Sequence, residues 1–61
     1  MTKSEDREIT TINRLYLAGL DTNVALALSS LIRSCRSKKS RNELMDYAHA
    51  WNVVSHPNFI V

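Results

Sequence analysis

The sequence predicts an all-α fold, a compact three-helix bundle with short connections, formed by one domain over residues 1–61. Three observations lead to this prediction. A length of 61 residues allows a single domain. One glycine and one proline in the whole chain argue against a turn-rich β fold. Apolar residues recur at helical spacing in three segments, each next to a residue that favours a helix start.

The first helix is expected at about residues 5–18. Ser4 is its expected N-cap, and the acidic residues that follow favour the positive end of the helix dipole. Gly19 offers a left-handed C-cap. When each residue is given about 100° of rotation, four apolar side chains share one arc of about 140°. They are Ile9, Ile12, Leu15 and Tyr16.

The second helix is expected at residues 22–36, with Asp21 as its N-cap and Thr22 or Asn23 as substitutes. Leu26 lies opposite the apolar stripe, on the side expected to face water. The stripe is wide enough to contact two neighbouring helices. It comprises Val24, Ala25, Ala27, Leu28, Leu31, Ile32 and Cys35.

The third helix is expected at residues 41–54, because Ser40 and Glu43 form a capping box just before an apolar run. It should end before His56, since Pro57 disfavours helical backbone at the residue that precedes it. The expected buried arc comprises Leu44, Tyr47, Ala48, Trp51 and Val54.

The second and third helices are predicted to be separate, although neither glycine nor proline lies between them. In one uninterrupted helix, Leu44 would lie about 200° away from Val24, and the two stripes would face opposite sides. A break near residues 37–40 lets both stripes face one core. An intertwined dimer is the exception, because a continuous helix there could pack one face against each half.

The short chain predicts association with a partner, because proteins of this size have marginal cores and usually add disulfides, a metal or oligomerisation. Cys35 is the only cysteine, and Cys35, His49 and His56 lack the number and spacing of zinc ligands. We therefore expect no metal and no cofactor, but a protein partner or a second copy in a homodimer. No segment approaches the ~20 apolar residues of a membrane span. We expect a cytoplasmic protein without a membrane partner.

A basic run places five positive charges within nine residues of a chain whose net charge is +2. It has two interpretations: it binds nucleic acid or an acidic protein, or it complements the end of the second helix and keeps the connection soluble. The sequence leaves both open. The run comprises Arg33, Arg36, Lys38, Lys39 and Arg41.

The alternative function is a small DNA-binding regulator of the helix-turn-helix type, using the basic region Arg33–Arg41. The bulk of Leu15 disfavours reading by the second helix, and Glu43 and Asp46 would repel phosphate from the third. The reading residues would be Thr22, Leu26, Ser29, Ser30 and Arg33, or Arg41, Asn42, Met45 and His49.

Several apolar residues lie outside the expected arcs and could form a docking patch if they cluster. The off-arc residues are Leu17, Leu26, Met45 and Val53. The apolar tail, residues 56–61, either folds back over an open end of the bundle, near Trp51, or inserts into a groove of another molecule. The candidate protein-binding residues are Leu17, Leu26, Met45, Phe59, Ile60 and Val61.

Other side chains are expected to be structural. Tyr16, Tyr47, Trp51 and Cys35 lie within apolar arcs and are predicted to be core residues. Asp46 and His49 are three residues apart on one helix, but such pairs are common on solvent faces and no nucleophile accompanies them. A small bundle also has little room for a substrate cleft. We expect no catalytic residue, no enzyme activity and no small-molecule substrate.

In its size and its lack of catalytic residues, the chain resembles the short accessory proteins of phages and plasmids, which bind and block a host factor. The resemblance implies a regulator or inhibitor. Together with the small core, the off-arc apolar residues and the apolar tail, it leads us to expect a small protein-interaction module that docks on a protein partner.

Overall fold

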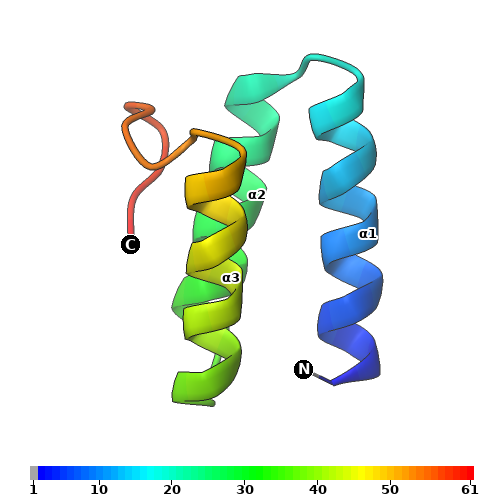
Figure 1. Ribbon diagram of the computed structural model, residues 1–61, viewed down its shortest axis with the longest axis vertical. Coiled ribbons are helices and arrows are strands. Elements are labelled where there is room, and N and C mark those ends of the chain that lie inside the picture. Colours follow the sequence, from blue (N-terminus) through cyan, green and yellow to red (C-terminus); the bar gives the residue numbers. More distant parts are fainter. Residues whose placement is uncertain (1) are drawn as a thin grey trace.

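The three apolar stripes form three helices in the computed structural model, which describes residues 2–61. They are α1 (Lys3–Leu17), α2 (Asp21–Ser34) and α3 (Lys38–Ala50), and the described part of the chain contains no strand. The prediction of an all-α three-helix bundle is confirmed. The helices run alternately up and down along the long axis, so α1 and α3 point in the same direction (Figure 1). The break that the phase of the two stripes predicts is present, but it lies at residues 35–37 and not at 37–40.

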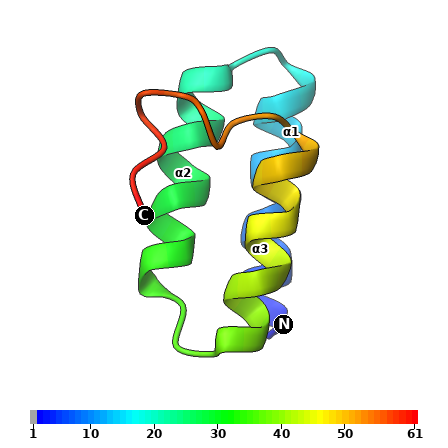
Figure 2. The same ribbon diagram turned by 60° about the vertical axis from the view of Figure 1, so that its left-hand side comes forward.

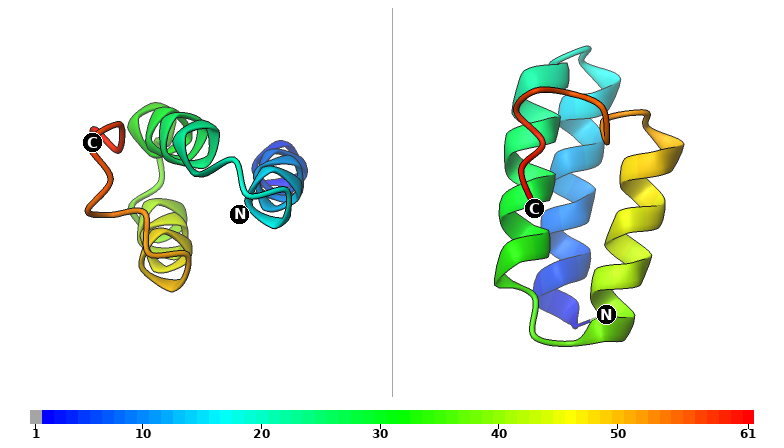
Figure 3. Two further views of the ribbon diagram at one scale, coloured as in Figure 1. Left: turned by 90° about the horizontal axis from the view of Figure 1, so that it is seen from above. Right: turned by 90° about the vertical axis from the view of Figure 1, so that its left-hand side faces the viewer.

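The core lies on α2, which is the middle element. Seen from above, α1 and α3 lie on different sides of α2 (Figure 3). The expected stripes of all three helices supply most of the buried side chains, and Leu28 and Leu44 have no exposed surface. The buried apolar residues are Ile9, Ile12, Val24, Ala25, Leu28, Leu31, Ile32, Cys35, Leu44, Ala48 and Val53.

The start of α1 differs from the prediction, because Thr2 and not Ser4 is the N-cap. The Glu5 backbone N–H donates to Thr2 Oγ1 at 3.2 Å, and the Thr2 backbone N–H donates to Glu5 Oε1 at 2.9 Å. This reciprocal pair satisfies two backbone N–H groups at once. Thr2 is preferred because a glutamate stands three residues after it, whereas Arg7 stands three residues after Ser4.

The end of α1 is a Schellman motif built around Gly19, as the sequence predicts. Gly19 has φ 78° and donates its N–H to the Tyr16 carbonyl at 3.0 Å. The Leu20 N–H donates to the Leu15 carbonyl at 3.1 Å. These bonds satisfy carbonyls that the helix end leaves unpaired. The chain then enters α2 directly, so that Leu20 is the N-cap and Asp21, the expected cap, is the first residue of the helix.

α3 begins three residues earlier than expected. Its N-cap is Ser37, whose Oγ accepts the Ser40 backbone N–H at 3.4 Å. The predicted capping box of Ser40 and Glu43 is therefore wrong: Ser40 lies inside the first turn and is buried. Ser37 and Ser40 are both good caps by residue type, and the extended backbone of Cys35 and Ser37 places Ser37 at the helix start.

α3 also ends earlier, at Ala50 and not at residue 54, because Asn52 adopts φ 57°. The Asn52 N–H donates to the His49 carbonyl at 3.1 Å, and the Val53 N–H donates to the Ala48 carbonyl at 3.0 Å. This is a second Schellman motif, with asparagine in the left-handed position. Such motifs turn the following apolar residue inward, and Val53 is 2% exposed. The expectation that Val53 contributes to a surface patch is wrong.

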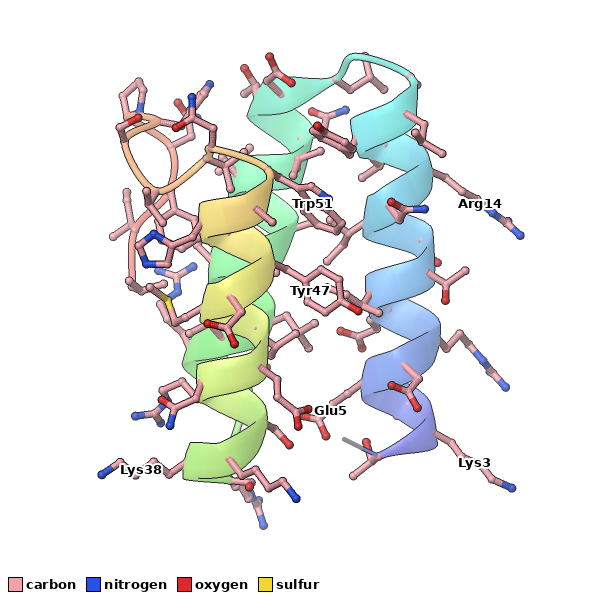
Figure 4. The ribbon with its side chains drawn as sticks, viewed as in Figure 1. Lys3, Glu5, Arg14, Lys38, Tyr47 and Trp51 are labelled. Atoms are coloured by element: carbon pink, nitrogen blue, oxygen red, sulfur yellow. The ribbon has the colours of Figure 1, made fainter. Side chains whose placement is uncertain are left out.

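The C-terminal segment after α3 folds back across α2 (Figure 2). Phe59 packs against the core, and successive turns are closed by bonds from the His56 N–H to the Val53 carbonyl and from the Phe59 N–H to the His56 carbonyl, each 3.0 Å. The predicted fold-back of the segment onto the bundle is confirmed, but the prediction that it lies near Trp51 is not. Trp51 points towards α1, on the other side of α3, so the segment does not cover it (Figure 4). No helix among residues 2–61 has the length and apolar character needed to cross a membrane.

Candidate functional site

The C-terminal segment brings together two groups of residues that lie far apart in the sequence. Val61, at the end of the segment, shares a hollow with Arg33 of α2 and with Arg41 and Met45 of α3. Leu26 lies two turns before Arg33 on the same side of α2. We call this surface the tail face; its residues are Leu26, Arg33, Arg41, Met45, Ile60 and Val61.

The tail face combines exposed apolar surface with positive charge. Leu26 is 48% exposed, Ile60 60% and Val61 61%. The hollow has a volume of about 390 Å³, and its walls consist of Ile32, Met45, Val61 and the two arginines. Of the residues predicted to bind a protein, Met45 and Val61 thus meet two members of the basic run. The structure therefore supplies part of the cluster that the sequence could only suggest.

One of the two arginines is held in place by the backbone. Arg41 Nη2 donates to the Cys35 carbonyl at 3.2 Å. That carbonyl lies at the end of α2, where the helix leaves acceptors unpaired. Since an arginine has five N–H donors, this bond orients the guanidinium and leaves other donors for a ligand. Arg33 is also exposed and stands in the last turn of α2.

The rest of the basic run is on other sides of the molecule. Arg36 and Lys39 line a cleft of about 550 Å³ together with Glu5 and Glu8 of α1. Lys38 points away from α1 at the far edge (Figure 4). All five cations of the run are exposed. Arg33 and Arg41 line the hollow of the tail face, whereas Arg36 and Lys39 line the cleft beside α1. The binding role of the basic run stays a prediction, and the structure separates its members into at least two groups.

A hydrogen bond at this cleft joins the start of α1 to the end of α2. The Cys35 thiol donates to Glu5 Oε2 at 3.0 Å. This bond, with a further one from the Thr2 backbone N–H, lowers the pKa of the Glu5 carboxyl. The carboxylate and burial together raise the pKa of the Cys35 thiol. The buried thiol is thus kept protonated, which fits its predicted place in the core.

A second apolar surface lies between α1 and α3. Tyr16 stacks on Trp51 with ring centroids 5.2 Å apart, and Tyr47 contacts Trp51 at the same distance. Tyr47 and Trp51 point from α3 towards α1 (Figure 4). We call these three residues the aromatic seam. Because α1 and α3 pack on α2 and not closely on each other, the rings bridge the gap between them.

The prediction that the three residues of the aromatic seam are core residues is wrong. Tyr16 and Tyr47 are each 37% exposed, and Trp51 is half-buried. A helical arc shows which side chains face inward, but it does not show how closely the next helix approaches. Tyrosine and tryptophan are frequent anchors of protein interfaces. The seam is therefore a candidate contact surface that sequence reasoning missed.

The remaining residues predicted to bind a protein, Leu17 and Phe59, do not contribute exposed surface to the tail face. Leu17 is 74% exposed and stands one turn after Arg14, which points away from the other helices (Figure 4). Phe59 belongs to the tail but packs inward, so it supports the tail face from below. Leu17 thus takes no part in the cluster.

The geometry does not favour a helix-turn-helix. That motif crosses its two helices at about 90–120°, whereas neighbouring helices here run close to antiparallel (Figure 1). Ser29, one of the proposed reading residues, is buried. Within residues 2–61, no three histidine, cysteine, aspartate or glutamate side chains are grouped as metal ligands. The chain matches no protein-family model, no curated protein and no solved structure.

Proposed function

We propose that this chain is a small non-enzymatic protein-interaction module, a regulator or inhibitor that docks on a protein partner through the tail face. The hollow that joins Arg33 and Arg41 to Met45 and Val61 carries the proposal. Exposed aliphatic side chains beside the hollow supply apolar contact area, and the arginines that line it would orient a bound partner. Interfaces commonly have an apolar centre with a polar rim that includes arginine.

The construction of the tail face supports docking as its role. The face is built on two helices and on a segment that Phe59 ties to the core. Ile60 and Val61 follow directly and remain exposed, although the same segment has an inward position for an apolar side chain. A rigid face costs less conformational entropy on binding than a mobile tail does.

A DNA-binding role has less support. Neighbouring helices lack the crossing angle of the helix-turn-helix, and the basic run is divided between different sides of the molecule. The two functions differ in their response to salt. Five contacts with DNA phosphates would lose up to about 500-fold in affinity between about 50 and 200 mM salt, whereas the affinity of an interface with an apolar centre changes far less.

Selection from a library of displayed peptides on the immobilised full chain tests the proposal. Selected peptides should bind Ile60→Ser at least about tenfold more weakly than the natural sequence. Leu17→Ser is the matched control, because Leu17 is also aliphatic and is more exposed than Ile60 but lies outside the tail face. Circular dichroism checks that both variants keep their helices. Selected peptides that bind both variants equally well would contradict docking through the tail face, and so would a failure to enrich any peptide.

A further inference from the structure

The charged side chains that line the hollow are of one sign. Arg33 and Arg41 line it, and no aspartate or glutamate side chain of the described chain does so. Within residues 2–61, the Arg33 guanidinium has no hydrogen-bond or ion-pair partner. The carboxylates of α1 instead meet the other half of the basic run, in the cleft formed by Glu5, Glu8, Arg36 and Lys39. The acidic residues of the chain therefore do not neutralise the tail face.

The two arginine side chains differ in how firmly they are held, and a ligand with fixed geometry suits the one that is oriented. Arg41 is oriented by its bond to the Cys35 carbonyl. Arg33 comes from the last turn of the neighbouring helix and is exposed. A carboxylate fits a guanidinium through two parallel hydrogen bonds, and such charge-assisted bonds are stronger than neutral ones. The rim of the hollow is thus suited to carboxylate groups.

The floor between the arginines is apolar, because Ile32, Met45 and Val61 form it. Ile60 and Leu26 add exposed aliphatic surface outside the hollow. A nucleic-acid backbone offers phosphates to arginines but has no aliphatic side chain for such a floor. A protein segment that carries carboxylates beside large apolar side chains satisfies both parts of the surface.

We infer that the tail face recognises an acidic, apolar segment of another protein, whose carboxylates bind Arg33 and Arg41 while an aliphatic or aromatic side chain enters the hollow. The inference rests on the proposed function and names the chemistry of the partner. A second copy fits less well. Among the described residues, a second copy could offer Leu17 and Leu20 near Asp21, or Tyr47, which shares a hollow with Glu43 and Asp46. Either contact would join two different faces, and so would build a ring or an open chain of copies and not a two-fold dimer.

The test uses the full chain and a pair of short, labelled helical peptides. One carries leucines on one face and glutamates on the others; the second has lysine in place of each glutamate. Fluorescence anisotropy should show the glutamate peptide binding at least about tenfold more tightly than the lysine peptide. Arg33→Glu should remove about tenfold or more of that affinity. Arg14→Glu is the matched control: it changes the net charge equally, but Arg14 points away from the bundle (Figure 4).

The outcomes separate the inference from the function on which it rests. If both peptides bind equally and Ile60→Ser weakens both, the face docks proteins but the acidic chemistry is wrong. If no peptide responds to Ile60→Ser or Arg33→Glu, the proposed function itself fails. Tighter binding of an oligonucleotide, with a steep salt dependence, assigns the arginines to phosphate and overturns the inference. Light scattering that detects self-association, abolished by Arg33→Glu, overturns it in favour of a second copy.

Discussion

Asn52 ends α3 from the left-handed region of the backbone, with φ 57°. This conformation costs most L-residues about 1–2 kcal/mol, while glycine adopts it freely and asparagine tolerates it. Asn52→Ala should therefore lower the free energy of unfolding by about 1 kcal/mol, and Asn52→Gly should leave it unchanged or raise it. Urea unfolding followed by circular dichroism measures both.

The control for Asn52 is Asn42→Ala, since Asn42 is exposed inside α3, where the backbone is helical. Alanine is the best helix former, so this variant should be as stable as the natural sequence or slightly more stable. Equal stability of Asn52→Ala and Asn42→Ala would show that the left-handed position carries no cost.

The Glu5 carboxyl makes the stability of the folded state depend on pH in the acid range. Its hydrogen bonds with Cys35 and Thr2 lower the pKa of the Glu5 carboxyl below its ordinary value of 4.5. The stabilisation is thus fully present above about pH 4.5 and is lost as the pH falls through the lower pKa of the folded state. Glu5→Gln should flatten the dependence of Tm on pH in this acid range. Glu8→Gln, a change in the same cleft, should leave the slope unchanged.

The same contact protects the thiol of Cys35. The Glu5 carboxylate and burial raise the pKa of the Cys35 thiol above its ordinary value of 9.0, so little thiolate exists at neutral pH. Reaction with iodoacetamide should therefore rise with pH over a more alkaline range than for a free cysteine. In Glu5→Gln, that range should move towards neutral pH. Identical pH profiles for the two proteins would show that the carboxylate does not control the thiol.

The helices themselves follow from periodicity, but their ends depend on finer features. The arcs of Ile9, Leu28 and Leu44 identify three buried faces, and phase alone places the break between α2 and α3. All three expected N-caps were wrong. Thr2 and Ser37 cap α1 and α3 in place of Ser4 and Ser40, because hydroxyl residues within one turn of each other cannot be ranked by residue type alone. Leu20 precedes α2 in place of Asp21, because the Schellman motif leads directly into that helix. The end of α3 was missed because an asparagine in the left-handed conformation has no signature in the sequence that separates it from any other asparagine.

The N-cap of α1 offers a direct comparison between the expected residue and the observed one. Thr2→Ala removes the capping hydrogen bond to the Glu5 N–H and should cost about 1 kcal/mol, which lowers Tm by about 4–8 °C in a domain of this size. Ser4→Ala should have little effect, since Ser4 is exposed within the first turn. Thermal unfolding of both variants decides which residue caps the helix; a larger loss in Ser4→Ala would reverse the assignment.

The molecule as a whole is no more open than other small proteins. Its accessible surface of 4180 Å² is close to the roughly 4,000 Å² expected of a monomer of this length. Its radius of gyration of 10.3 Å is close to about 10.5 Å, the value for a compact chain of the same length. The need for a partner, which short length suggested, therefore finds no support in total exposure. It rests on where the exposed apolar residues lie, and the sequence could not show this because the tail face is assembled by the fold-back of the C-terminal segment.

That fold-back divides the C-terminal segment into a part that holds it and a part that faces outward. Phe59 is half-buried against the core, so Phe59→Ala should lower the free energy of unfolding by about 2 kcal/mol, less than the 3–5 kcal/mol of a fully buried phenylalanine. Ile60→Ala should change stability by less than about 0.5 kcal/mol, because Ile60 is 60% exposed. Urea midpoints, with the slope of the transition checked for each variant, give both values.

If Phe59→Ala unfolds at the same urea concentration as the natural sequence, the segment is not anchored, and the hollow that Val61 completes would not persist in solution. If the loss falls on Ile60 instead, the side chain assigned to docking is structural, and the apolar part of the tail face would have to be assigned to other residues.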